Sequence, residues 1–182
     1  SANGDVYVAW SERGRDAFDG DEDVYIVVGR NGGQTWETGF NLSHNGGTSD
    51  YPELAISNSG VQVVWHDGMS GVMDVWHSRS INGGKDFTER HNIGQTPYGF
   101  VYRPRVAASG DNVHIVWSDA FDVYYALSTD NGVSFDSYFL SSTNDKSNAL
   151  HPRLAPNGAY VSAAWDQGDF EPLINPLPLP QR

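Results

Sequence analysis

Charged side chains recur at fixed positions along this sequence and could bind charged ligands. Four acids closely follow similarly placed tryptophans: Glu12, Asp67 and Asp119 stand two residues after theirs, and Asp166 stands directly after Trp165. Arginine, tyrosine and histidine gather beside three repeated prolines, at Tyr51, Tyr102, Arg103, Arg105, His151 and Arg153. A planar guanidinium group matches a carboxylate bidentately, so the arginines of this set are suited to holding an acidic ligand.

A second group of carboxylates lies in the stretch "DAFDGDEDVY", from Asp16 to Tyr25. Asp19, Asp21 and Asp23, together with a glycine for a sharp turn, offer the oxygen ligands that calcium prefers. The spacing of an EF-hand and its distal glutamate are missing, and a solvated acidic loop is the alternative interpretation. The sequence therefore indicates either a calcium-binding loop or solvated charge at these residues.

The charged residues are positioned by a repeat of short apolar segments. One segment alternates apolar residues and ends in tryptophan: "VYVAW" at Trp10, "VQVVW" at Trp65, "VHIVW" at Trp117 and "VSAAW" at Trp165. The alternation predicts β-strands. Their opposite face is also small or apolar, and such strands are covered on both faces. We therefore expect the four tryptophans to be buried between neighbouring sheets.

Three other short segments accompany this strand. "PELAIS", "PRVAAS" and "PRLAPN" precede it, "DVYIVVG", "DVWHSRS" and "DVYYALS" come after it, and a fourth segment such as "SYFLSS" closes the unit. Four short antiparallel strands in about 50 residues are the size of one propeller blade. We call them the first, second, third and outer strands.

A short box separates the third strand from the outer strand in three copies: "GRNGGQTW" from Gly29, "SINGGKDF" from Ser80 and "STDNGVSF" from Ser128. Turn chemistry explains each position, because Asp or Asn bonds its own backbone and Gly supplies a positive φ. We expect the final aromatic residue to pack beneath the turn.

The boxes resemble the Asp-box (BNR) motif, Ser-x-Asp-x-Gly-x-Thr-Trp, of sialidase-like β-propellers. Residues 128–135 fit the motif best, whereas Gly29, Asn31 and Asp86 depart from it. The resemblance implies an all-β chain, a β-propeller of four-stranded antiparallel blades, with about three and a half blades present.

The strand pattern divides the chain into blades at residues 1–43 (partial), 50–94, 101–142 and 150–166 (partial), with a proline-rich tail or linker at 167–182. Both terminal blades are incomplete in this inventory, and open strand edges are usually paired or covered. We therefore expect further blades or another protomer to complete the propeller.

The resemblance also implies where a ligand would bind. In the family, the second-to-third and outer-to-first loops share the functional face, which here carries Tyr51, Asp67, Arg103, Arg105, Asp119, His151 and Arg153. Three arginines of a sialidase hold the substrate carboxylate, a Tyr–Glu pair is the nucleophile and an Asp is the acid/base. No late Arg–Tyr segment matches here, so the catalytic residues remain unassigned. The alternative is structural, with repeated acids capping each blade and ion pairs joining adjacent blades.

Composition narrows the classes of partner. The net charge of −12 over 182 residues argues against nucleic acid, and the absence of cysteine excludes disulfides and a cysteine nucleophile. No apolar run approaches the roughly 20 residues of a membrane helix, so we expect no membrane insertion.

The first hypothesis is a non-catalytic extracellular or cell-surface β-propeller module that binds a glycan or protein or serves in assembly. A fragment of a sialidase-like glycoside hydrolase and a calcium-stabilised structural module are the alternatives.

Overall fold

Antiparallel β-strands make up the regular structure of the chain. The computed structural model describes residues 4–13, 22–94, 99–120, 122–141, 148–157 and 160–168. These described residues form fourteen strands and no helix. Among them, no helix is long and apolar enough to cross a membrane. The all-β prediction is confirmed, whereas the predicted proline-rich tail beyond Gly168 lies outside the described residues.

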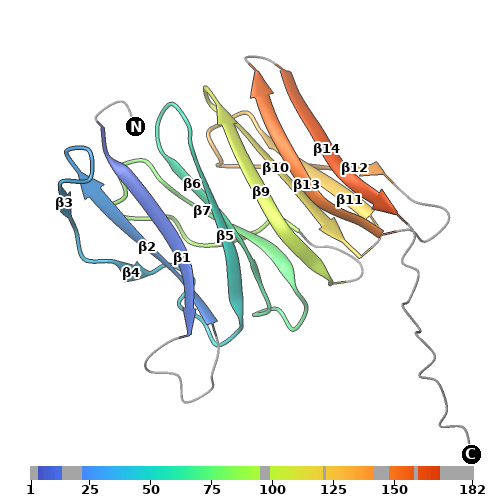
Figure 1. Cartoon of the computed structure of the whole chain (residues 1–182), viewed down its shortest axis with the longest axis horizontal. Helices are drawn as coiled ribbons and strands as arrows, with labels where there is room; N and C mark the ends of the chain where they lie inside the picture. Colours follow the sequence, from blue (N-terminus) through green and yellow to red (C-terminus); the bar gives the residue numbers. More distant parts are fainter. Residues whose placement is uncertain are drawn as a thin grey trace, which may run out of the picture.

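The strands form four sheets that succeed one another in the sequence (Figure 1). The first sheet contains β1 (Val6–Arg13), β2 (Glu22–Arg30), β3 (Thr35–Trp36) and β4 (Phe40–Asn41). The second contains β5 (Ser49–Ile56), β6 (Val61–Asp67), β7 (Asp74–Ser80) and β8 (His91–Asn92). The third contains β9 (Val101–Ser109), β10 (Asn112–Asp119), β11 (Asp122–Ser128) and β12 (Asp136–Ser141). The fourth contains β13 (Asn148–Asn157) and β14 (Tyr160–Gly168).

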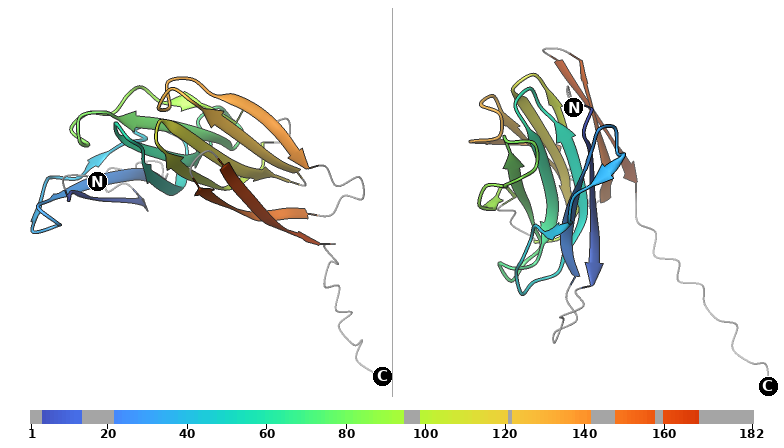
Figure 2. Two further views of the ribbon diagram at one scale, coloured as in Figure 1. Left: turned by 90° about the horizontal axis from the view of Figure 1, so that it is seen from above. Right: turned by 90° about the vertical axis from the view of Figure 1, so that its left-hand side faces the viewer.

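Strand order is the same wherever the sheets can be compared. The second and third sheets run first, second, third and outer strand in sequence, and β13 pairs with β14 as first with second. In the first sheet β1 is a second strand, and its outer segment is split into β3 and β4, both paired with β2. The first strands β5, β9 and β13 lie side by side, and the sheets fan out from them (Figures 1 and 2).

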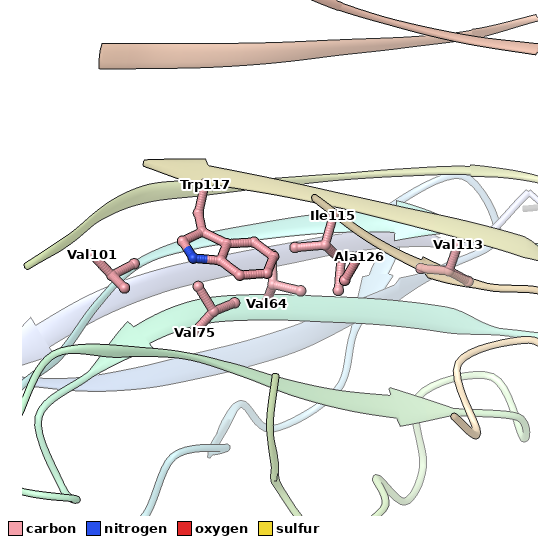
Figure 3. Packing of buried hydrophobic residues seen from close by; sticks show 7 residues of the cluster. All are labelled: Val64, Val75, Val101, Val113, Ile115, Trp117 and Ala126. Atoms are coloured by element: carbon pink, nitrogen blue, oxygen red, sulfur yellow. The ribbon is translucent and has the colours of Figure 1, made fainter. Parts of the chain in front are cut away.

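The core lies between neighbouring sheets. Trp117 and Ile115 of the third sheet pack on Val64 and Val75 of the second (Figure 3). Trp65 packs in the same way among residues of the first sheet, and both of these indoles are 0% exposed. Trp10 and Trp165 are only half-buried, in the two sheets at the ends of the stack. The burial predicted for the four tryptophans is therefore complete at the two central ones.

Hydrogen bonds within the box turn hold its shape. In the third sheet, Asp130 Oδ1 accepts from the backbone N–H of Val133 and of Ser134, at 3.0 Å each. Ser128 Oγ accepts from the N–H of Gly132 at 2.7 Å. These bonds favour the carboxylate and hold the pKa of Asp130 well below its usual range, chiefly through Ser134. The second sheet repeats the pattern with Ser80 and Asn82.

The box turn also joins one sheet to the preceding one. Buried Gln62 of the second sheet donates through Nε2 to the carbonyl oxygen of Asn131, at 3.3 Å. His77 Nε2 donates to Gln62 Oε1 at 2.9 Å, and the Phe135 ring meets the His77 ring edge-on at 4.9 Å. The third box is thus fixed to the second sheet by a buried polar network.

The box aromatics differ in how far they are buried. Phe87 and Phe135 pack against the cores between sheets, as predicted. Trp36 lies against Gly29 and Gly33 of its own turn but is 52% exposed. The difference arises because, in the described part of the chain, no sheet covers that face of the first sheet.

Truncation of the repeated tryptophans should rank them by burial. Trp117→Ala removes a wholly buried indole, which typically costs about 3–5 kcal/mol of unfolding free energy. Trp165→Ala should cost less, because the same repeat position is half-buried there. Denaturant melts of the two variants measure the order, and an equal or larger loss for Trp165→Ala would contradict it.

Protonation of His77 should weaken the fold at acid pH. Burial, helped by the nearby His91 and Arg79 charges, lowers the pKa of His77 from 6.5 to about 3. Between pH 6.5 and about 3, His77 binds a proton in the unfolded chain but stays neutral in the folded chain. The stabilisation is therefore complete above pH 6.5 and is lost as the pH falls toward 3, with a slope approaching about 1.4 kcal/mol per pH unit.

His77→Gln is the matched variant, because it keeps a polar partner for Gln62 and cannot titrate. Unfolding free energies of wild type and variant, measured from pH 7 to 4, should diverge with this slope. Parallel curves would show that His77 does not contribute.

Candidate functional site

A backbone irregularity recurs where each first strand meets its proline. Tyr51, Arg103 and His151 precede these prolines and have φ values of 52°, 41° and 51°. At each, two residues of the first strand lie opposite one tryptophan of the second strand, which is a β-bulge. A positive φ is uncommon for residues other than glycine, and bulges often re-aim side chains next to binding sites.

The bulges bring arginine and aromatic side chains of adjacent sheets together. The Arg103 guanidinium lies 5.0 Å from the centre of the Tyr51 ring and 6.0 Å from that of Tyr102. The two tyrosine rings stack at 6.3 Å. His66 meets Tyr51 edge-on at 5.0 Å. A cation is therefore held against two aromatic faces, a favourable arrangement for guanidinium groups.

A second arginine lies further along the same strand, on the other side of Pro104. Arg105 forms an ion pair with Glu53 of the neighbouring first strand. Burial and then the nearby Arg153 charge lower the pKa of Arg105 from its usual value. The structure thus places Arg153 close enough to repel Arg105, and three guanidinium groups gather along the first strands.

These residues line a small pocket. Its volume is about 260 Å³, and it is formed by Tyr51, Pro52, Glu53, Arg103, Pro104 and Arg105. A larger cavity of about 610 Å³ lies between β8 and the third box, and one of about 370 Å³ lies between β4 and the second box. These two cavities occupy equivalent places between neighbouring sheets, so we attribute them to the packing of one sheet on the next. We take the smaller pocket, beside Arg103, as the candidate site.

The predicted acids do not line this pocket. Asp67 is buried, and its Oδ2 accepts from Trp65 Nε1 at 2.9 Å, Ser49 Oγ at 2.8 Å and Asn45 Nδ2 at 2.7 Å. Asp119 is also buried and accepts from the Phe100 N–H at 2.7 Å.

The acids that follow the tryptophans of the terminal sheets are likewise paired, although Asp166 stands one residue nearer to its tryptophan than the others. Glu12 accepts from Trp10 Nε1 at 3.1 Å. Asp166 lies 3.2 Å from Nδ1 of His151, on the exposed surface of the fourth sheet. An acid two residues after the tryptophan thus bonds the indole in two sheets, which explains why the spacing repeats.

The calcium prediction falls largely on residues outside the described structure, namely Asp19 and Asp21. Asp23 is described, and its carboxylate accepts from Asn41 Nδ2 and Ser43 Oγ, at 2.7 Å each. Among the described residues, no group of three or more acidic or histidine side chains is arranged to hold a metal.

His66 is a member of the site that the sequence did not single out. It is buried beneath Tyr51, and burial lowers its pKa from 6.5 despite the charges of Asp50 and Asp67. The signal in the sequence that could have identified His66 is its position directly after the repeated Trp65. Contact with Tyr51 depends on the bulge, which the sequence pattern did not reveal.

Comparison with solved structures identifies the fold that these sheets form. The Hadza microbial sialidase Hz136 superposes with a TM-score of 0.64 at 14% identity, over 91% of this chain and 40% of that chain. The leech intramolecular trans-sialidase superposes with a TM-score of 0.56 at 16% identity, over 91% of this chain and 26% of that chain. The fold is a β-propeller.

The predicted fold class is thereby confirmed, and the sheets are blades. The chain spans less than half the length of these two sialidase structures, and at this identity the likeness concerns the fold alone. No family model and no curated protein matches the sequence.

Replacement of Asp67 should lower the stability of the fold, because its carboxylate accepts three hydrogen bonds within its own blade. Asp67→Asn keeps the shape of the side chain but removes its charge. The Asn amide nitrogen also cannot accept the hydrogen bonds that the carboxylate accepts from Trp65, Ser49 and Asn45. Hydrogen bonds to a buried charge contribute about 1.5–3 kcal/mol, so we expect a loss of that size in unfolding free energy.

Asp166→Asn is the control, because it makes the same change at an exposed acid beside the tryptophan of the fourth sheet. Its carboxylate is 81% exposed, so the change should stay within about 0.5 kcal/mol. Thermal and denaturant melts that show equal effects at the two positions would contradict this assignment.

Proposed function

We propose that the pocket between the second and third blades binds the carboxylate of an acidic glycan without cleaving it. The observation that supports this is Arg103, a guanidinium group held against Tyr51 and Tyr102. Among the described residues, no acid forms an ion pair with it. An incoming carboxylate would supply the missing counter-charge and accept hydrogen bonds from the guanidinium group.

Charge and ring geometry support the same ligand class. Arg103, Arg105 and Arg153 concentrate positive charge along the first strands of a chain whose net charge is −12. The pocket combines the Tyr51 ring and two prolines with a few charged groups, which is typical of small-ligand sites. The choice of a glycan rests on the resemblance of the boxes to those of sialidase-like propellers and on the sialidase structures that share the fold.

The state of the nearby acids supports binding without turnover. Glu53 is paired with Arg105, and the Asp67 carboxylate is occupied by hydrogen bonds within its own blade. A glycosidase acid or nucleophile must instead reach the scissile bond. Acidic glycans of this kind are displayed outside cells, so the proposal includes an extracellular or cell-surface location.

Arg103→Ala should weaken binding of a sialoside at least tenfold. A charge-assisted hydrogen bond contributes about 1.5–3 kcal/mol, and about 1.4 kcal/mol corresponds to tenfold in the dissociation constant. Isothermal titration calorimetry measures the change. Lys85→Ala removes the same charge from an exposed box residue at the opposite end of the second blade, and it should leave the affinity within twofold.

Equal affinities of wild type and Arg103→Ala would contradict the site. A fluorogenic sialoside tests the second part of the proposal, because binding without turnover predicts no release of the fluorophore. Release that disappears in Arg105→Ala or Arg153→Ala would favour the hydrolase alternative instead.

A further inference from the structure

A groove lies between the outer strands of neighbouring blades at two places. Between the first and second blades its volume is about 370 Å³, and between the second and third blades it is about 610 Å³. Strand register makes the two grooves equivalent, because Phe40 lies opposite Ile26 of β2 as His91 lies opposite His77 of β7. Packing of one blade on the next creates both grooves, but their linings differ.

One difference in sequence explains why the second groove is larger. In the first groove, the Phe40 ring packs on the box aromatic Phe87, with ring centres 5.8 Å apart. His91 takes the place of Phe40 in the second groove, and there the box aromatic Phe135 meets the His77 ring edge-on at 4.9 Å. The phenyl ring that fills the first groove therefore has no counterpart in the second.

Aromatic rings of the third blade form one wall of the larger groove. The Trp117 and Tyr124 rings stack at 5.7 Å with their planes 12° apart, and Phe139 meets Tyr124 at 5.5 Å and 68°. All three residues line the groove, and Phe139 is 53% exposed. The wall thus presents apolar ring surface to a cavity of the size that small ligands occupy.

Two polar side chains border this aromatic wall. Ser137 lies on the same face of β12 as Phe139, because side chains alternate along a strand. His91 of β8 lines the opposite side of the groove. In the described part of the chain, neither side chain takes part in a hydrogen bond. The hydroxyl and the imidazole are therefore free to bind a polar ligand.

The charged residues of the region do not favour an ionic ligand. Asp136 is the acid of the lining, but alternation places its side chain on the other face of β12 together with Tyr138. Among the described residues that line the groove, none is Lys or Arg. A buried ion needs a counter-charge, so the lining favours an uncharged ligand.

We propose that the groove between the outer strands of the second and third blades binds an uncharged pyranose ring of a saccharide. A pyranose carries C–H groups on its faces and hydroxyl groups around its edge. It can therefore pack on the aromatic wall while its hydroxyl groups bond His91 and Ser137. The carboxylate pocket lies on the first strands, at the opposite edge of the blades, so this inference is independent of the proposed function.

Two simple hexosides test the proposal with the full 182-residue chain. Methyl β-galactoside and methyl β-glucoside are titrated separately, and NMR spectra of the backbone amides follow binding. For at least one of them we expect saturable shifts of the His91 and Ser137 signals, with a dissociation constant of about 1 mM for a ligand of this size.

Phe139→Ala and Tyr138→Ala are a matched pair of variants. The two residues are adjacent in β12 and similarly exposed, at 53% and 48%, but the Tyr138 ring packs on Tyr125 on the other face. Phe139→Ala should weaken hexoside binding about tenfold, because it removes ring surface from the groove. Tyr138→Ala should leave the affinity within about twofold.

His91→Phe is the decisive variant, because it introduces the ring that fills the first groove. We expect it to abolish saturable hexoside binding without lowering the melting temperature. Sialoside affinity, measured by calorimetry, should not change in this variant, and Arg103→Ala should not change the hexoside affinity. The two sites can thus fail separately.

Three results would overturn the inference. One is the absence of saturable shifts with both hexosides. Another is equal hexoside affinity of wild type and folded His91→Phe, which would place binding elsewhere. The third is cyclohexanol binding as tightly as the hexosides and at the same amides, which would show an apolar patch that does not recognise a saccharide.

Discussion

Apolar surface on both faces of each blade is the constraint on which the rest of the structure depends. Val64 and Trp65 are adjacent in β6, point to opposite faces, and are both buried, one toward the third blade and one toward the first. A sheet of this kind is stable only between two neighbours. The half-burial of Trp10 and Trp165 shows the same rule at the ends of the stack.

The box turn satisfies this constraint at the periphery of the blades. Its serine, aspartate and glycine fold the turn, and the same turn presents Asn131 and Gly132 to the blade before it. A motif that turn chemistry alone could explain therefore has a second role between blades. The first-strand bulges act at the other end of the blades, where they bring Tyr51 and Arg103 into contact.

Features set by local chemistry and periodicity could be predicted from the sequence. Alternation of apolar residues predicted the strands that contain Trp65 and Trp117. The box glycine predicted a positive φ in the turn, and Gly132 has a φ of 82°. The left-handed conformation of Arg103 before Pro104 had no local signal, because a residue before proline usually favours an extended conformation. The contact of Arg103 with Tyr51 arises from that bulge and from packing across two blades, and neither is encoded in spacing.

The central functional claim is the proposed carboxylate site, and a charged ligand compared with its neutral counterpart tests it. If Arg103 binds the carboxylate, its guanidinium group should distinguish a charged oxygen pair from a neutral ester of similar shape. Calorimetric titration of the wild-type chain with a sialoside and with its methyl ester compares the two directly. The account predicts saturable binding of the acid and at least tenfold weaker binding of the ester. Equal affinities, or no binding of either, would contradict it.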